Sequence, residues 1–308
     1  ASEIVVVRVE EDGYAIESSV SLTGDGTGVD YMQLGMGLTS INGYNGSQYF
    51  ANLCHGMRPW ARRATSGGSG TWSQLNGRRT ALVGTDQFVA YISNNGVAFL
   101  SGDYVVRNPD GCEYAFGANN DNPGTWRTDA EFTATLSPTD GNGVYLFVKG
   151  SLTGNFQIIK ADHVDSYDAG CIWLDTVLDF HSGLGTDPFR SMDITSGSIN
   201  FETDWADRVP PDAVSFASHY ATGLSVVPWE YLFDLANRLD TDIWINIPSR
   251  ATEDYGAELG AVINSELNAG HRVYDELANE IWNEATPWRD GALWVAYSDH
   301  PKYTATAN

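Results

Sequence analysis

Apolar residues recur at helical spacing in two segments of the last third of the chain. In residues 228–239, Leu232, Phe233 and Ala236 share one face with the flanking apolar positions, and a second such face runs from about residue 253 to 268. Short apolar runs near residues 36, 190, 243 and 274 are separated by these helices or by other long segments. An alternation of strands and amphipathic helices predicts parallel strands joined by right-handed crossovers.

The middle of the chain shows a different pattern. Short segments rich in β-branched and aromatic residues recur about every ten residues, and turn sequences such as Asn94-Asn-Gly96 and Pro109-Asp-Gly111 separate them. This spacing is typical of an antiparallel β-sandwich. The expected strands are residues 88–92, 102–107, 131–136, 144–148 and 156–159.

Together these patterns predict an α/β protein: the N-terminal half of a (β/α)8 TIM-type barrel with an inserted antiparallel β-sandwich. We expect residues 1–65 to hold the N-terminal strand and the first βα unit, residues 66–165 the sandwich, and residues 166–308 barrel units two to four. Four units are half of such a barrel. We therefore expect a C-terminal segment or another chain to complete it.

Charge narrows the classes of partner. The chain carries 40 acidic and 17 basic residues, a formal net charge of -23. Such a surface repels phosphate backbones and anionic headgroups, which argues against nucleic acid and membranes, and it suits a neutral substrate. A surface adapted only for solubility explains the same charge equally well. The three cysteines show no metal-ligand spacing, and the turn 119–122 offers calcium a single carboxylate, so no metal or cofactor is expected.

The expected strand ends carry residues suited to sugar chemistry. Reactive groups of a (β/α) barrel follow the C-terminal ends of its strands, and indole rings stack on the apolar face of a pyranose. Glycoside hydrolysis normally uses two carboxyl groups across the scissile bond. Glu280 is the predicted catalytic residue, and the predicted substrate-binding residues are Asn279, Asp193, Asn246, Trp282 and Trp205.

Several segments occur in the chain in a recognisable order: residues 189–193, 205–208, 229–230 with 235–237, 242–248, 254–255 and 273–283. They resemble a family of cellulase-like bacterial proteins that have a glycosidase barrel interrupted by a β-sandwich. The resemblance implies that Glu280 is the acid/base and that Asn279 binds the sugar hydroxyl beside the nucleophile. It places the nucleophile after a seventh strand, outside this sequence. Two positions depart from the family pattern, Ile194 and Ser249, where an aromatic residue and a histidine are expected.

Two functions follow from these features. The first is a retaining glycoside hydrolase that acts on extracellular polysaccharide, with Glu280 as acid/base. The alternative is a non-catalytic protein of a phage tail fibre or other surface appendage that binds polysaccharide or cell-surface glycan. Either function places the protein outside the cell or on a virion or surface appendage. A lyase is less favoured, because the chain has few basic residues to neutralise a uronate.

Overall fold

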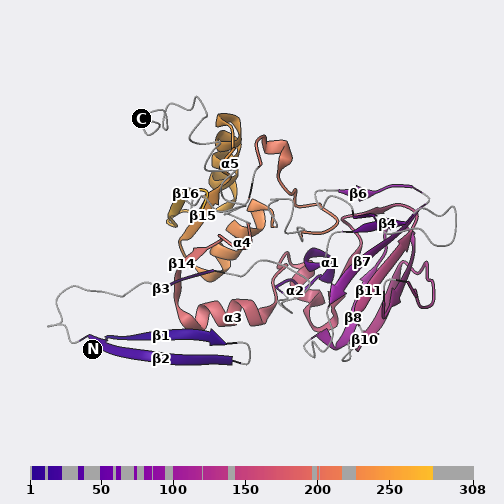
Figure 1. Cartoon of the computed structure of the whole chain (residues 1–308), viewed down its shortest axis with the longest axis horizontal. Coiled ribbons are helices and arrows are strands. Elements are labelled where there is room, and N and C mark those ends of the chain that lie inside the picture. The colour runs from indigo at the N-terminus through magenta and orange to yellow at the C-terminus, as the bar shows by residue number, and fades with distance from the viewer. Residues whose placement is uncertain are drawn as a thin grey trace.

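The protein was analysed as a computed structural model. It describes residues 2–10, 13–22, 34–37, 49–57, 60–63, 73–74, 80–84, 86–93, 100–119, 121–137, 143–195, 200, 202–216 and 227–279. The antiparallel sheets from the middle of the chain occupy one end of the molecule, and a parallel sheet occupies the other (Figure 1). The first two strands, β1 (Ser2–Glu10) and β2 (Gly13–Leu22), pair with each other in an antiparallel hairpin.

Two larger antiparallel sheets come from the middle of the chain. One has the order β10-β8-β13 and the other the order β5-β4-β7-β11-β9, while β12 pairs with β6. Their strands are β4 (Ala61–Arg63), β5 (Ser73–Gln74), β6 (Ala81–Leu82), β7 (Gln87–Ser93), β8 (Gly102–Arg107), β9 (Glu113–Gly117), β10 (Glu131–Leu136), β11 (Val144–Lys149), β12 (Leu152–Thr153) and β13 (Gln157–Lys160).

One hydrophobic core lies between these sheets. Alternating residues of β8 and β11 face it, among them Tyr104, Val106, Leu146 and Val148, because successive strand residues point to opposite faces. Short helix α1 (Leu53–Gly56) contributes Leu53 to the same core. Alternation within these strands thus explains which side chains are buried.

The remaining strands form a parallel sheet in the order β16-β15-β14-β3. Its strands are β3 (Leu34–Gly37), β14 (Thr186–Arg190), β15 (Ile243–Ile247) and β16 (Val273–Leu277). The helices α2 (Val164–Asp168), α3 (Asp175–Leu184), α4 (Trp229–Leu239) and α5 (Glu253–Glu266) complete the described helical elements, with short 3-10 turns at Ala161–His163 and Trp205–Asp207. The predicted helices near 228–239 and 253–268 and the strand at 243–247 are confirmed.

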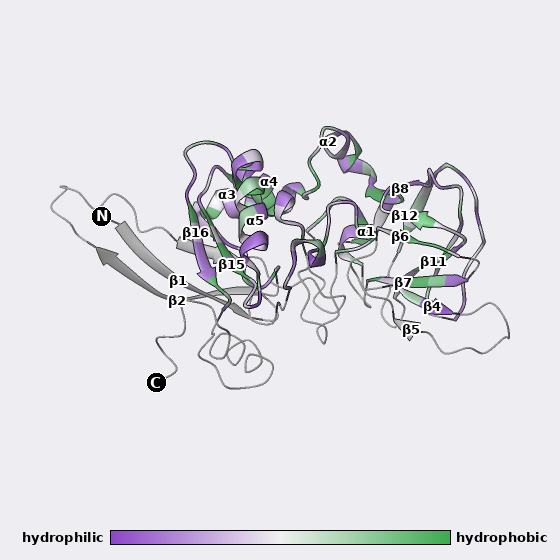
Figure 2. Ribbon diagram, turned by 90° about the horizontal axis from the view of Figure 1, so that it is seen from above, coloured by the Kyte–Doolittle hydropathy of each residue, from purple (hydrophilic) through white to green (hydrophobic). Residues whose placement is uncertain are grey.

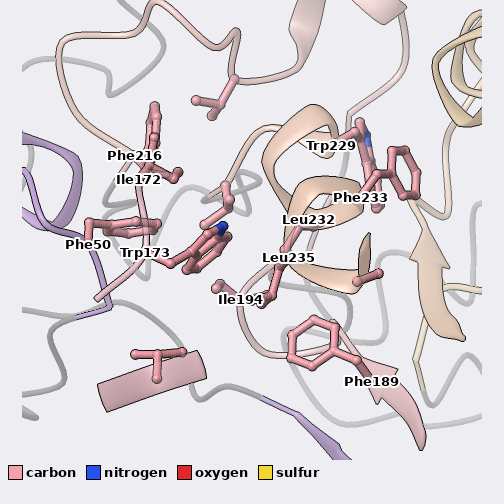
Figure 3. Packing of buried hydrophobic residues seen from close by; sticks show 14 of the residues in the cluster. Phe50, Ile172, Trp173, Phe189, Ile194, Phe216, Trp229, Leu232, Phe233 and Leu235 are labelled. Carbon is pink, nitrogen blue, oxygen red and sulfur yellow. The ribbon is translucent and has the colours of Figure 1, made fainter. Parts of the chain in front are cut away.

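A second core packs α4 and α5 against one face of the parallel sheet. Leu232 and Phe233 of α4, Leu259 of α5 and Ile243 and Ile245 of β15 are all buried in it. Figure 3 shows Trp173 between Phe50 on one side and Ile194 and Leu235 on the other. The core therefore ties the segment before α1 to the helices of the parallel sheet.

The predicted half barrel is wrong. Among the described residues, twelve of the sixteen strands lie in antiparallel sheets, there are five α-helices, and the four parallel strands form an open sheet. A strand–helix alternation sets the direction of neighbouring strands, but it does not determine sheet closure. The expected need for a segment or chain to complete a barrel therefore loses its basis. Strand β14 also ends at Arg190, three residues before Asp193, where we expected the strand near residue 190 to end.

Candidate functional site

The carboxyl ends of β14, β15 and β16 bring together polar side chains from three separate parts of the sequence. Arg190 pairs in register with Trp244, and Asn246 pairs with Glu276. Paired residues of neighbouring strands point to the same face of a sheet. Because Ile243 and Ile245 face the helices, Trp244 and Asn246 lie on the opposite face, together with Arg190 and Glu276.

The Glu276 carboxylate is the centre of this group. One oxygen, Oε2, accepts three hydrogen bonds: from Asn246 Nδ2 at 2.9 Å, from Arg190 Nη2 at 3.0 Å and from Trp244 Nε1 at 3.1 Å. The Arg190 guanidinium also lies over the Trp244 indole, 4.7 Å from the ring centroid. Both side chains of the Arg190–Glu276 ion pair are 32% exposed. The site thus contains a carboxylate whose charge a partly exposed arginine compensates.

The chain that leaves β16 is anchored to the same group. Ala278 has a φ of 52°, a left-handed conformation that costs a non-glycine residue about 1 kcal/mol or more. Both of its backbone polar groups are bonded: its N–H donates to Ile247 O at 2.7 Å, and its carbonyl accepts from Asn246 Nδ2 at 3.1 Å. Asn279 follows, and its Oδ1 accepts from Arg190 Nη2 at 3.1 Å. The predicted residues Asn246 and Asn279 therefore meet at one place.

Three buried polar atoms near this edge have no hydrogen-bond partner among the described residues. They are Asn246 Oδ1, Arg190 Nε and Ser249 Oγ. Asn246 is fully buried, and its amide orientation is fixed because Nδ2 faces two acceptors. A buried polar atom without a protein partner costs about 1–3 kcal/mol unless an ordered water or a ligand bonds to it.

Asp193 interacts with this group through the charge of Arg190. It lies three residues beyond the end of β14, and the residue as a whole is exposed. Desolvation of its carboxyl by the neighbouring chain nevertheless raises the pKa of Asp193, and the positive charge of Arg190 opposes that rise. A carboxyl with a raised pKa next to an arginine suits hydrogen bonding to a polar ligand.

Trp205 contacts other residues. Its ring packs edge-to-face on Tyr255, 5.1 Å between centroids, and the Arg208 guanidinium lies 4.1 Å from its centroid. Tyr255 in turn donates a hydrogen bond to the buried Glu202 at 2.8 Å and accepts one from Trp229 Nε1 at 2.9 Å. The described contacts thus place Trp205 in a packing network with α5. The other two predicted residues, Glu280 and Trp282, lie outside the described residues.

Sequence reasoning missed Arg190, Trp244, Tyr274 and Glu276. All four lie within strands, whereas the search considered residues after strand ends. The signal was present in β16, where Glu276 and the preceding Asp275 interrupt an otherwise apolar strand, and Figure 2 shows this edge strand in hydrophilic colours. A charged residue such as Glu276 inside an apolar strand indicates a strand face that does not pack against the core.

The described side chains show no group of three or more His, Cys, Asp or Glu residues that could hold a metal ion. The three cysteines are buried thiols, and burial raises the pKa of Cys112 to about 12. Within the part of the chain that the structure describes, every helix is too short or too polar to span a lipid bilayer. Comparison with protein-family models, curated proteins and solved structures finds no match to this chain.

Proposed function

We propose that the protein is a glycoside hydrolase that acts on neutral extracellular polysaccharide, with Glu280 as acid/base. The observation that supports this proposal best is the fixed position of Asn279, the residue immediately before Glu280, at the carboxyl end of β16. The Asn279 amide is held by Arg190 beside a carboxylate and an indole. Amides, carboxylates and indoles are the groups that bind sugar hydroxyls and pyranose faces.

Glu276 is held in place by its neighbours. Its Oε2 accepts hydrogen bonds from Arg190, Trp244 and Asn246, so we assign it the role of orienting these side chains. The acid/base is assigned to Glu280, four residues further along the chain, because the resemblance to cellulase-like proteins gives it this role.

Replacement of Glu280 by Gln tests the proposal. Release of reducing ends from neutral polysaccharides by Glu280→Gln should fall by about 10²–10⁴-fold, the usual contribution of a general acid/base, while binding is retained. Glu258→Gln is the matched control, because Glu258 is an exposed glutamate of α5 that lies beyond the first turn of the helix. Wild-type turnover by Glu280→Gln would contradict the assignment.

A non-catalytic glycan-binding protein of a surface appendage is the second candidate. The observation that favours it is that Glu276 is held in an ion pair with Arg190 and in hydrogen bonds from Trp244 and Asn246, a fixed polar group that suits the binding of sugar hydroxyls. Wild-type protein that binds glycans on an array and releases no reducing ends from any of those glycans would support this alternative over hydrolysis.

A further inference from the structure

Two exposed aromatic side chains lie next to each other on the parallel sheet. Among the described residues, four large hydrophobic side chains are exposed, and two of them are Trp244 at 36% and Tyr274 at 38%. These two residues are direct partners in the register of β15 and β16. Single exposed apolar residues are common on protein surfaces, but adjacent exposed aromatics beside polar groups indicate a binding site.

The side chains lie on the sheet face opposite α4 and α5. Residues of β15 alternate: Ile243 and Ile245 are fully buried against the helices, whereas Trp244 between them is exposed. The Trp244 ring is also held in place, because its Nε1 donates to Glu276 and Arg190 lies over one side of it. A fixed ring loses little conformational freedom when a ligand stacks on it.

A polar atom beside the two rings can bind a hydroxyl group. Glu276 Oε2 accepts all three hydrogen bonds described above, and its other oxygen, Oε1, accepts none from the described residues. Glu276 is 32% exposed, so this acceptor belongs to a side chain that a ligand can reach. A hydroxyl group is a donor that matches it.

The charges favour a neutral ligand. Arg190 forms an ion pair of 3.0 Å with Glu276, so the arginine described at this site is already neutralised. The chain as a whole carries a net charge of -23, which repels acidic polysaccharides. Neutral pyranoses combine an apolar C–H face, which matches the two rings, with hydroxyl donors, which match the Glu276 acceptor.

We propose that Trp244 and Tyr274 form a stacking platform for a neutral pyranose chain, with a hydroxyl of the sugar bound by Glu276 Oε1. This inference rests on the proposed function and deepens it, since it states the sheet face on which the sugar lies and the two rings on which it stacks. Binding on this face needs no catalysis. The platform can therefore be tested separately from hydrolysis.

The test is calorimetric titration of the full chain with soluble oligosaccharides. The probes are neutral cello-, manno-, xylo- and malto-oligosaccharides and, for comparison, an oligogalacturonate. At least one neutral probe should bind, and Trp244→Ala and Tyr274→Ala should each weaken it about tenfold, the equivalent of the loss of one aromatic stacking contact. Tyr274→Phe should bind like the wild type because it keeps the ring. Leu184→Ala is the control, since Leu184 is 39% exposed on α3.

Four outcomes would overturn the platform. Three concern binding: no neutral probe binds, the oligogalacturonate binds as tightly as or more tightly than the neutral probes, or both alanine variants keep the wild-type affinity. The fourth is a wild-type dimer that Trp244→Ala converts to a monomer, because a second copy of the chain would then cover this face. Wild-type binding with no release of reducing ends would leave the platform intact and refute hydrolysis. Release of reducing ends by the wild type, together with unchanged affinity of both alanine variants, would support hydrolysis and refute the platform.

Discussion

His55 should make the protein less stable as the pH falls below neutrality. Its imidazole is stacked on Phe216, 4.4 Å between centroids, and the rings of Phe50, Tyr167 and Tyr231 also lie within 6.3 Å of it. Desolvation in this aromatic environment lowers the pKa of His55 from 6.5 to about 3. The folded protein therefore keeps His55 neutral at pH values where the unfolded chain protonates it.

The magnitude follows from this difference in pKa. Between pH 6.5 and about 3 the unfolded state binds the additional proton, so the free energy of unfolding falls as the pH falls. Each pH unit in this range is worth about 1.4 kcal/mol. At pH 5.0, which is 1.5 units below the unfolded pKa, His55 should cost about 2 kcal/mol relative to pH 7.5.

The assay is urea denaturation of the wild type and of His55→Phe at pH 7.5 and pH 5.0. The pH 7.5 measurement gives the packing cost of the larger ring, so only the change between the two pH values is compared. His55→Phe should lose about 2 kcal/mol less than the wild type over this range. His181, whose pKa burial also lowers, contributes equally to both proteins and cancels. Equal losses in the two proteins would refute the reasoning.

Two further substitutions test the polar networks. Tyr255→Phe should lower the free energy of unfolding by about 2–3 kcal/mol in urea titration, because it removes the hydroxyl that joins the buried Glu202 to Trp229. The control is Tyr274→Phe on the exposed face, which should change the free energy of unfolding by less than about 0.5 kcal/mol. Equal effects of the two substitutions would contradict this account. Glu276→Gln should lower the free energy of unfolding by only about 1 kcal/mol, since its ion pair with Arg190 is partly exposed. Added salt should reduce this difference from the wild type. A difference that does not depend on salt would show that the charge of Glu276 is not responsible.

Local patterns allowed the elements of the last third to be predicted. The apolar face of 228–239 produced α4 because Leu232 and Phe233 are one turn from Leu235 and Ala236, and all four enter one core. The run at 243–247 produced a parallel strand because helices precede and follow it. These predictions depend on contacts close in sequence, for which periodicity is a direct signal.

Closure of the sheet and the centre of the site depend on contacts far apart in sequence. The hydrogen bond between Arg190 and Glu276 spans 86 residues, and no periodicity within β14 or β16 specifies how these strands align. Asn246 and Asn279 were predicted because they are near the ends of strands. Glu276 was missed because it precedes the end of β16 and its role depends on donors from β14 and β15.

The alternation of β15 separates the function of this sheet from its stability. Ile243 and Ile245 hold the helices, whereas Trp244 faces the candidate site, so Trp244 can be truncated without a cavity in the core. Asn246 is different, because it is fully buried and bonded to both Glu276 and Ala278 O. Its replacement would alter the turn at Ala278 as well as any ligand contact. A loss of sugar binding on substitution of Trp244 or Tyr274 is therefore evidence about the site, whereas the same loss at Asn246 would reflect the fold as well.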